Sequence, residues 1–308
     1  MSIDFIDAHR GVFGVEPICK ALQIAPSTYY AAKNRPLSAR ALRDLVMTQI
    51  LMVLWVKNRK VYGAHKLWKA ALRAGHVIGR DQVARLMREA SIRGTTRSRR
   101  VFTTIQDLGA TRAMDLVKRH FVAVRPDALW VTDLTYVPTR AGMAYVCFIV
   151  DVFSRRIVGW TAANHMRTDM VLDAVDMARK SRGVKRFVDL ITHSDAGSQF
   201  TSLRFTDRLA EIGARPSIGT VADSYDNALA ETINGLYKAE CVYGPDSHGW
   251  ADVDELELAT LSWVHWFNHD RLHGYCGDIP PAEYEANWAY DQLSGNGGAN
   301  QEVPVTAL

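Results

Sequence analysis

The spacing of apolar residues along this chain changes near residue 120. Before that point, apolar positions recur every three or four residues, which predicts amphipathic helices. From about residue 125 onward they gather in short runs rich in β-branched and aromatic residues, which predict strands separated by further helices. The pattern therefore predicts an all-α N-terminal region followed by an α/β domain.

The N-terminal region opens with a candidate helix-turn-helix at residues 16–30. Its second helix starts at Pro26, and we expect Ser27 to cap that helix. Tyr29 and Tyr30 are expected to face either DNA or the core, and Tyr29 is the candidate DNA contact. Many helical hairpins share this spacing, so the sequence leaves both interpretations of this unit open.

A second candidate unit has helices at residues 62–74 and 80–88. Gly75 lies between them and suits a left-handed helix stop. The second helix is expected to turn Val83, Leu86 and Met87 inward. Its other face would then present three arginines to DNA phosphates: Arg80, Arg85 and Arg88.

We predict a helical DNA-binding region at residues 1–92, a basic linker at 93–120, an α/β domain at 121–290 and a disordered tail at 291–308. The linker is too polar to bury much surface. It could lie along DNA or form a solvated connector, and its candidate DNA contacts are Arg97, Arg99 and Arg100.

The domain from residue 121 is predicted to alternate strands and helices. Strands are expected at 129–137, 145–152, 156–162, 188–192 and 215–218. Three helices are also expected: one capped by Thr168, one at 203–212 and one that begins at Asn227. We expect Pro280-Pro281 to end the helical segment that follows. Periodicity alone indicates only a mixed α/β fold.

Three carboxylates occupy positions at which the pattern of apolar residues gives no structural reason for a charged side chain. Asp133 interrupts an apolar strand, Asp195 follows the predicted strand at 188–192, and Glu231 opens a helix. A charge in a buried strand is costly unless it is paired or bound to a metal. Three carboxylates that converge therefore suggest a divalent-metal site, and oxygen ligands favour Mg²⁺ or Mn²⁺ over zinc.

Four blocks of sequence carry a resemblance to a known family. They are WVTDLTY at 130–136, HSDAGSQF at 193–200, SYDNALAE at 224–231 and WFNHDRLH at 266–273. Together they resemble the D-D-E catalytic core of the type-three family of insertion-sequence transposases, which are related to retroviral integrases. The 35 residues between Asp195 and Glu231 belong to this pattern.

The resemblance implies a ribonuclease-H-like integrase catalytic core in which Asp133, Asp195 and Glu231 are both catalytic residues and metal ligands. It implies two Mg²⁺ ions, with Mn²⁺ able to substitute, Asp133 bridging the ions and the other two acids binding one ion each. The paired His and Cys zinc domain of retroviral integrases is not visible at the N-terminus.

The resemblance also implies an activity and partners. The enzyme would bind the terminal inverted repeats of its element, cut a strand and direct the freed 3′-OH at target DNA, as a homo-oligomer on DNA. It implies a partner protein from an upstream reading frame, fused by frameshifting, and the chain's start at Met1 without a long zipper-like region fits the downstream product.

The charge distribution supports a nucleic-acid partner. The net charge is +4, but residues 1–120 carry 22 Lys and Arg against 8 Asp and Glu, giving +14, while residues 121–308 carry 15 against 25, giving −10. A basic region can neutralise phosphates, and an acidic one can hold metal-binding carboxylates. A solvated basic helical domain would show the same excess.

Other features bear on localisation and on unrelated chemistry. No apolar run is long enough to cross a membrane, and no cationic signal-peptide start is present. Four cysteines without close pairing predict reduced thiols in a cytoplasmic protein. The resemblance implies a bacterial, nucleoid-associated protein. The absence of a Gly-Lys-Ser/Thr loop argues against ATP hydrolysis.

Several polar residues near the acidic blocks have two interpretations. Lys238 lies two helical turns beyond Glu231 and is a candidate phosphate contact or an ordinary surface lysine. His193 and Ser194 could touch the scissile phosphate or form strand-end hydrogen bonds. Asp151 is expected in a turn or ion pair, and Asp226 is a helix cap and the best substitute for Glu231.

The C-terminal block adds one rival metal site. His265, His269 and His273 recur every four residues, with Cys276 beyond, which is compatible with zinc. The same stretch matches the family's Asn-x-x-Arg block, Asn268 to Arg271, which favours packing against the core or DNA contact.

We therefore predict a DNA transposase. A metal-dependent nuclease without joining activity and a helix-turn-helix DNA-binding regulator are the alternatives. A complete acidic triad argues against the regulator, whereas only product analysis separates a transposase from a nuclease.

Overall fold

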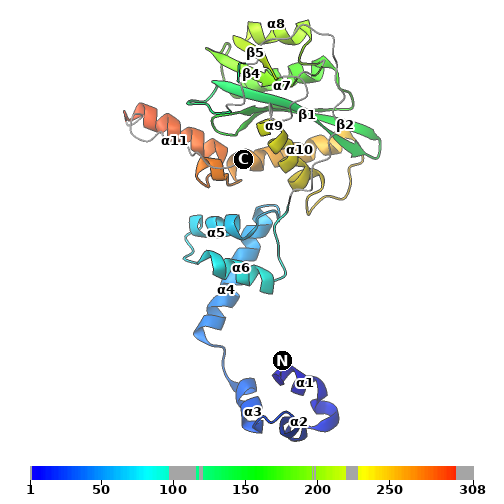
Figure 1. Cartoon of the computed structure of the whole chain (residues 1–308), viewed down its shortest axis with the longest axis vertical. Helices are drawn as coiled ribbons and strands as arrows, with labels where there is room; N and C mark the ends of the chain where they lie inside the picture. The colour runs from blue at the N-terminus through cyan, green and yellow to red at the C-terminus, as the bar shows by residue number, and fades with distance from the viewer. Residues whose placement is uncertain are drawn as a thin grey trace. The chain divides into compact units, whose positions relative to one another are not determined.

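A computed structural model describes residues 2–96, 116–117, 121–195, 197, 199–219 and 228–295 of the chain. The chain divides into two compact units, Met1–Ile50 and Leu51–Leu308 (Figure 1).

The first unit contains helices α1 (Ser2–Phe13), α2 (Val15–Ala21) and α3 (Pro26–Asn34), followed by the start of α4 (Ala39–Lys57). Its core consists of Ile6, Ile18, Cys19 and Tyr29. The two-helix unit predicted at residues 16–30 is present as α2 and α3. Ser27 is not its cap, because Ala25 occupies the N-cap and Pro26 begins the helix.

Tyr29 was expected as a DNA contact, and the structure contradicts this. Its side chain is only 1% exposed, and its hydroxyl donates a hydrogen bond of 2.7 Å to Asp7. Asp7 also pairs with Lys33 at 2.6 Å, which ties α3 to α1. The neighbouring Tyr30 is the exposed aromatic residue of this helix.

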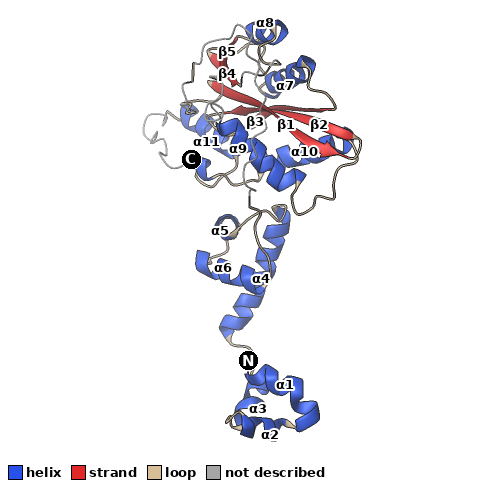
Figure 2. Cartoon of the chain, turned by 45° about the vertical axis from the view of Figure 1, so that its right-hand side comes forward, coloured by secondary structure: helices blue, strands red, loops and turns tan. Residues whose placement is uncertain are grey.

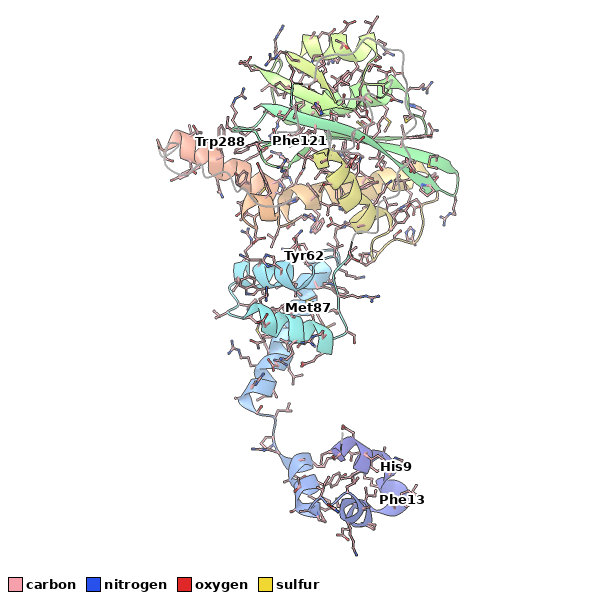
Figure 3. All side chains as sticks on the ribbon, in the orientation of Figure 1. His9, Phe13, Tyr62, Met87, Phe121 and Trp288 are labelled. Carbon is pink, nitrogen blue, oxygen red and sulfur yellow. The ribbon has the colours of Figure 1, made fainter. Side chains whose placement is uncertain are left out.

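The second unit begins with the rest of α4, followed by α5 (Ala64–Arg73) and α6 (Arg80–Glu89). Gly75 follows α5 with φ 83°, which confirms the predicted left-handed stop. Val83, Leu86 and Met87 are buried as predicted; Met87 is labelled in Figure 3.

The α/β part forms a five-stranded sheet in the order β3-β2-β1-β4-β5. The strands are β1 (Leu129–Thr139), β2 (Gly142–Asp151), β3 (Ile157–Ala163), β4 (Leu190–Ser194) and β5 (Ala214–Ile218). Strand β2 runs antiparallel to both β1 and β3, and β4 runs parallel to both β1 and β5. All five predicted strands are present, with ends shifted by a few residues.

Helices cover both faces of this sheet (Figure 2). On one face, α7 (Thr168–Ser181) and α8 (Leu203–Glu211) contribute to a large apolar core. On the other face lie α9 (Ala228–Tyr237) and α10 (Val253–His269), whose Tyr237 and Trp263 pack against Phe148 of β2. The predicted α/β class with an N-terminal helical region is confirmed.

Two predicted helix ends were wrong. Thr168 is the first residue of α7, and Arg167 occupies the N-cap without a side-chain bond. Pro281 does not end a helix but begins α11 (Pro281–Leu293). Proline is well suited to a first helical position, since its fixed φ is helical and its missing N–H has no partner there. Helix α11 also extends into the predicted tail, of which residues 296–308 lie outside the described part of the chain.

A buried ionic cluster attaches α11 to the sheet. Arg182, at the end of α7, contacts Asp151 at 2.9 Å and Glu285 of α11 at 2.7 Å. Ser154 donates a hydrogen bond of 2.6 Å to Glu285. The ion-pair role predicted for Asp151 is confirmed.

No described helix is both long and apolar enough to cross a membrane. The four cysteines are buried free thiols.

Candidate catalytic site

Sheet topology brings Asp133 and Asp195 to neighbouring positions. Strands β1 and β4 pair in parallel, with Val131 opposite His193 and Thr132 opposite Ser194. The next residue along each strand is a predicted site residue, Asp133 in β1 and Asp195 just after β4. Adjacent parallel strands thus place two acids side by side although they are far apart in sequence.

Cross-strand pairing also decides which face Asp133 occupies. Asp133 pairs with Phe148 of β2, and directly opposite residues in antiparallel strands share a face. The Phe148 ring lies 5.0 Å from that of Tyr237, at the end of α9. Asp133 therefore faces α9, the helix that carries Glu231.

Helix α9 contacts Asp133 directly through a residue that the sequence analysis missed. Asn234 donates a hydrogen bond of 2.9 Å from its side-chain nitrogen to Asp133 Oδ2. Glu231 lies three residues earlier, in the first turn of α9, so both side chains project from the same face. Their helical spacing could have identified Asn234 from the sequence.

Backbone amides hold one oxygen of each aspartate. The Leu134 amide donates to Asp133 Oδ1 at 2.8 Å, and the Gly197 amide donates to Asp195 Oδ1 at 3.0 Å. A Cβ added at Gly197 would lie 3.0 Å from Asp195 Oδ1, so the glycine permits this close turn. These bonds fix the aspartates while leaving lone pairs on their oxygens.

Burial and neighbouring carboxylates change the protonation of the two aspartates. Burial raises the pKa of Asp133 to about 8, with further contributions from the nearby carboxylates of Asp195 and Glu231. Burial also raises the pKa of Asp195. Partly buried carboxylates that repel one another, with only oxygen donors, suit a hard divalent cation.

The acids are nevertheless not arranged as a closed ligand set. Within the described residues, no three His, Cys, Asp or Glu side chains are grouped so that they could hold a metal ion. Carboxylates of like charge repel one another. Ligation would therefore require small side-chain movements towards the ion. The substitute ligand Asp226 lies outside the residues that the structure describes.

Lys238 is located at the C-terminal end of α9, where the helix widens into a π-helical turn, η2 (Lys238–Val242). Its ammonium group lies 4.4 Å from the centre of the Tyr136 ring. Tyr136 is 40% exposed and follows Asp133 by three residues on β1. The sequence analysis did not foresee this cation–π contact, which places the Lys238 charge at the exposed end of β1.

His193 and Ser194 lie beneath the site rather than on its surface. Each is 1% exposed, and His193 Nδ1 lies 2.9 Å from Ser217 Oγ on β5. The strand-end hydrogen-bond interpretation is therefore confirmed for His193.

The Asn268–Arg271 block packs against the core. The Asn268 side-chain amide makes two hydrogen bonds to the backbone of Ile157, of 2.9 and 2.8 Å. Arg271 forms a buried ion pair of 2.6 Å with Glu240 in the η2 turn. The sequence analysis missed Glu240 because a single acid within an apolar turn carries no distinctive spacing.

The structure does not support the rival zinc site. Helix α10 ends at His269, so His273 is not on the same helix face as His265 and His269. Burial lowers the pKa of His273, and the neighbouring Arg271 lowers it further. Cys276 donates a hydrogen bond of 3.2 Å to the Ser154 carbonyl.

The candidate DNA contacts on α6 are solvent-accessible but paired locally. Arg80 contacts Asp81 at 3.1 Å, Arg85 contacts Glu89 at 2.9 Å, and Arg88 donates to the Ala84 carbonyl. Exposed pairs of this kind are weak and can exchange for phosphates. The linker candidates Arg97, Arg99 and Arg100 lie outside the described residues.

Comparison with protein families matches three domain models. An integrase core domain model matches residues 123–224, a second integrase core model matches 212–281, and a helix-turn-helix-like domain model matches 41–100. The integrase matches include Asp133, Asp195 and Glu231, and the helix-turn-helix-like match includes α5 and α6.

Curated relatives align over most of their length. A protein of insertion sequence element IS986/IS6110 from Mycobacterium tuberculosis is 50% identical over 268 residues, covering 86% of this chain and 96% of that protein. The transposase for insertion sequence element IS629 of Shigella sonnei is 46% identical over 296 residues, covering 94% and 97%. Transposase InsF for insertion sequence IS3A of Escherichia coli is 25% identical, covering 92% and 98%.

Proposed function

Because the chain belongs to the type-three family of insertion-sequence transposases, with an integrase core, we propose that Asp133, Asp195 and Glu231 form its strand-transfer site. The proposal is carried by the parallel pairing of β1 with β4, which sets Asp133 beside Asp195, together with the hydrogen bond from Asn234 of α9 to Asp133, three residues from Glu231. In a stable fold without a functional requirement, three mutually repelling acids would be costly.

The donor set fits divalent cations. As the family resemblance implies, Asp133 would hold both ions, and Asp195 and Glu231 would each hold one; the influence of both other acids on the pKa of Asp133 supports this division. Bound Mg²⁺, or Mn²⁺ in its place, would stabilise the attacking and leaving oxygens of a phosphodiester exchange. The backbone donors at Leu134 and Gly197 would keep the two aspartates oriented for that ligation.

Lys238 would hold a DNA phosphate near the reacting strand. Its ammonium group lies against the exposed Tyr136 ring, whereas Glu231 is in the first turn of α9, at the other end of that helix. A lysine stacked on an aromatic ring keeps its positive charge and can still donate hydrogen bonds to a phosphate. We propose that this pair positions DNA.

DNA binding outside the site is assigned to the helical region. The +14 charge of residues 1–120 and the exposed arginines of α6 support this assignment. Recognition of terminal inverted repeats and target DNA, assembly of several copies on DNA, and a partner from an upstream frame belong to the same proposal. The regulator and nuclease alternatives are not favoured, because the full-length relatives are transposases.

A strand-joining assay tests the site. Purified protein is incubated with element-end DNA and Mg²⁺, and joined strands are quantified for Asp133→Asn, Asp195→Asn and Glu231→Gln. Each variant should lose joining while DNA binding persists, since shape is kept and a metal-binding charge removed. Glu257→Gln, on the exposed side of α10, is the control and should join normally. Near-native joining by any triad variant would remove that residue from the site.

A further inference from the structure

Asn234 uses only one end of its side-chain amide in hydrogen bonding at the acidic site. The residue is 8% exposed, and its side-chain nitrogen donates to Asp133 Oδ2 at 2.9 Å. Its side-chain oxygen is buried and has no hydrogen-bond partner within the part of the chain that the structure describes. Buried acceptors are nearly always paired, so this oxygen calls for an explanation.

The chemistry of Asp133 fixes which end of the amide is unpaired. When Asp133 binds a cation it is ionised and can only accept hydrogen bonds, so in that state the group that faces it is the Asn234 NH₂, as in the observed contact. Turning the amide over would set oxygen against oxygen. The free acceptor therefore cannot be removed by exchanging the two ends of the side chain.

A second buried asparagine shows what a purely structural role looks like in this fold. Asn268 is 6% exposed, and it uses both ends of its amide on the backbone of Ile157, at 2.9 and 2.8 Å. Asn234 is equally buried but leaves its oxygen unused. A role in packing alone accounts for Asn268 and not for Asn234.

We infer that Asn234 is a positioning residue for the divalent cations of the site. Its NH₂ fixes Asp133 Oδ2, while the Leu134 amide fixes Oδ1, so the carboxylate keeps one orientation. Its free oxygen accepts a hydrogen bond from the hydration shell of a bound cation. Outer-shell partners of this type orient ligands and tune affinity. The inference rests on the proposed metal-dependent function.

The test measures Mn²⁺ binding by the full chain without DNA, from the electron paramagnetic resonance signal of the free ion. Asn234→Leu keeps the side-chain volume and removes both polar ends, so Mn²⁺ affinity should fall by about 10- to 100-fold. Asn268→Leu is the matched control. It should lower the melting temperature and leave Mn²⁺ affinity unchanged. Affinity of the Asn234→Leu protein within about twofold of wild type would overturn the inference.

A second variant should increase the effect of Mn²⁺ on stability instead of weakening Mn²⁺ binding. It also covers the case in which Asn234→Leu does not fold. Asn234→Asp places another carboxylate beside Asp133 and keeps an acceptor. Its melting temperature in EDTA should be lower than that of wild type, and the rise on adding Mn²⁺ should be larger. An Mn²⁺-induced rise equal to that of wild type would contradict the inference.

Asp133→Asn separates this inference from the proposed function. If wild type binds no Mn²⁺, or if Asp133→Asn binds it as well as wild type does, the proposed metal site itself fails. If Asp133→Asn loses binding and Asn234→Leu retains it, the metal site stands and only the role of Asn234 is refuted.

Discussion

Asp133→Asn should stabilise the ion-free protein while it abolishes strand joining. Without cations, Asp133 is partly buried beside Asp195 and Glu231, and its pKa rises from 3.8 to about 8. An asparagine of the same shape carries no charge and does not repel its neighbours. Stability and activity should therefore move in opposite directions at this position.

The sign of the pH dependence follows from the raised pKa. The folded chain keeps a proton on Asp133 that the unfolded chain releases, so the free energy of unfolding should fall as pH rises from about 4 to about 8. Below that window both states are protonated, and above it both are ionised. Asp133→Asn should flatten this part of the profile.

The size of the effect can be bounded. At about 1.4 kcal/mol per pKa unit, raising the pKa of a carboxyl group by roughly 4 units lowers the free energy of unfolding by about 5 kcal/mol near pH 7.5. An amide in the same place still bears a burial cost, so we expect a gain of about 2 kcal/mol. For a unit of this size, that corresponds to roughly 4–8 °C in melting temperature.

Differential scanning calorimetry in EDTA provides the assay, with scans at several pH values and a repeat with Mn²⁺. Glu257→Gln removes an exposed acid and serves as the control for net charge. With Mn²⁺ present, wild type should regain the advantage, because cations compensate the carboxylates. A lower melting temperature for Asp133→Asn in EDTA at neutral pH would refute the proposed repulsion.

Further substitutions test the contacts of Lys238, Arg88 and Arg271. Lys238→Ala should lower strand joining about tenfold or more with Mn²⁺ binding unchanged, because a hydrogen bond to a charged phosphate is worth about 1.5–3 kcal/mol, and Lys238→Arg should keep part of the activity. Arg88→Ala should weaken DNA binding and reduce the salt slope by about 1, measured by titration at several salt concentrations. Arg271→Met should destabilise by about 3–5 kcal/mol in urea unfolding, since it leaves Glu240 buried and unpaired, and adding Glu240→Met should recover most of the loss. Unchanged values in any of these measurements would contradict the corresponding contact.

The sequence predicted the fold best where one physical signal dominates. Val83, Leu86 and Met87 follow helical spacing and are buried together. The five strands were predicted from runs of β-branched and aromatic residues and occur in the expected order. Periodicity reports the faces of single elements, and these were mostly correct.

Prediction failed where a contact between distant segments decides the outcome. Tyr29 and Tyr30 are adjacent, and the hydrogen bond from Tyr29 to Asp7 on α1 determines which of them is buried. No local pattern contains that information. Pro281 was taken as a stop because proline both ends and begins helices, and only the chain that follows distinguishes the two cases.

The three acids were singled out by their positions in the pattern of the chain, and the resemblance then assigned them to one site. Asp133 and Asp195 become neighbours only because β1 and β4 pair in parallel, a long-range arrangement that sequence spacing does not specify. The Asn234 contact depends in addition on the packing of α9 against that face. Its spacing of three residues from Glu231 was a usable signal, but it gains meaning only once the helix is placed.

The position of α9 is in turn fixed by the C-terminal block, which explains why residues remote from the acids belong to the same pattern. Arg271 pairs with Glu240 in the π-helical turn directly after α9, and Trp263 donates to the same carboxylate at 3.3 Å. Glu240 lies within this π-helical turn, where its buried carboxylate meets Arg271. The ion pair thus holds the end of the helix whose first turn carries Glu231. A catalytic carboxylate on a helix requires that helix to be anchored, because ligand geometry tolerates errors of only about 0.5 Å.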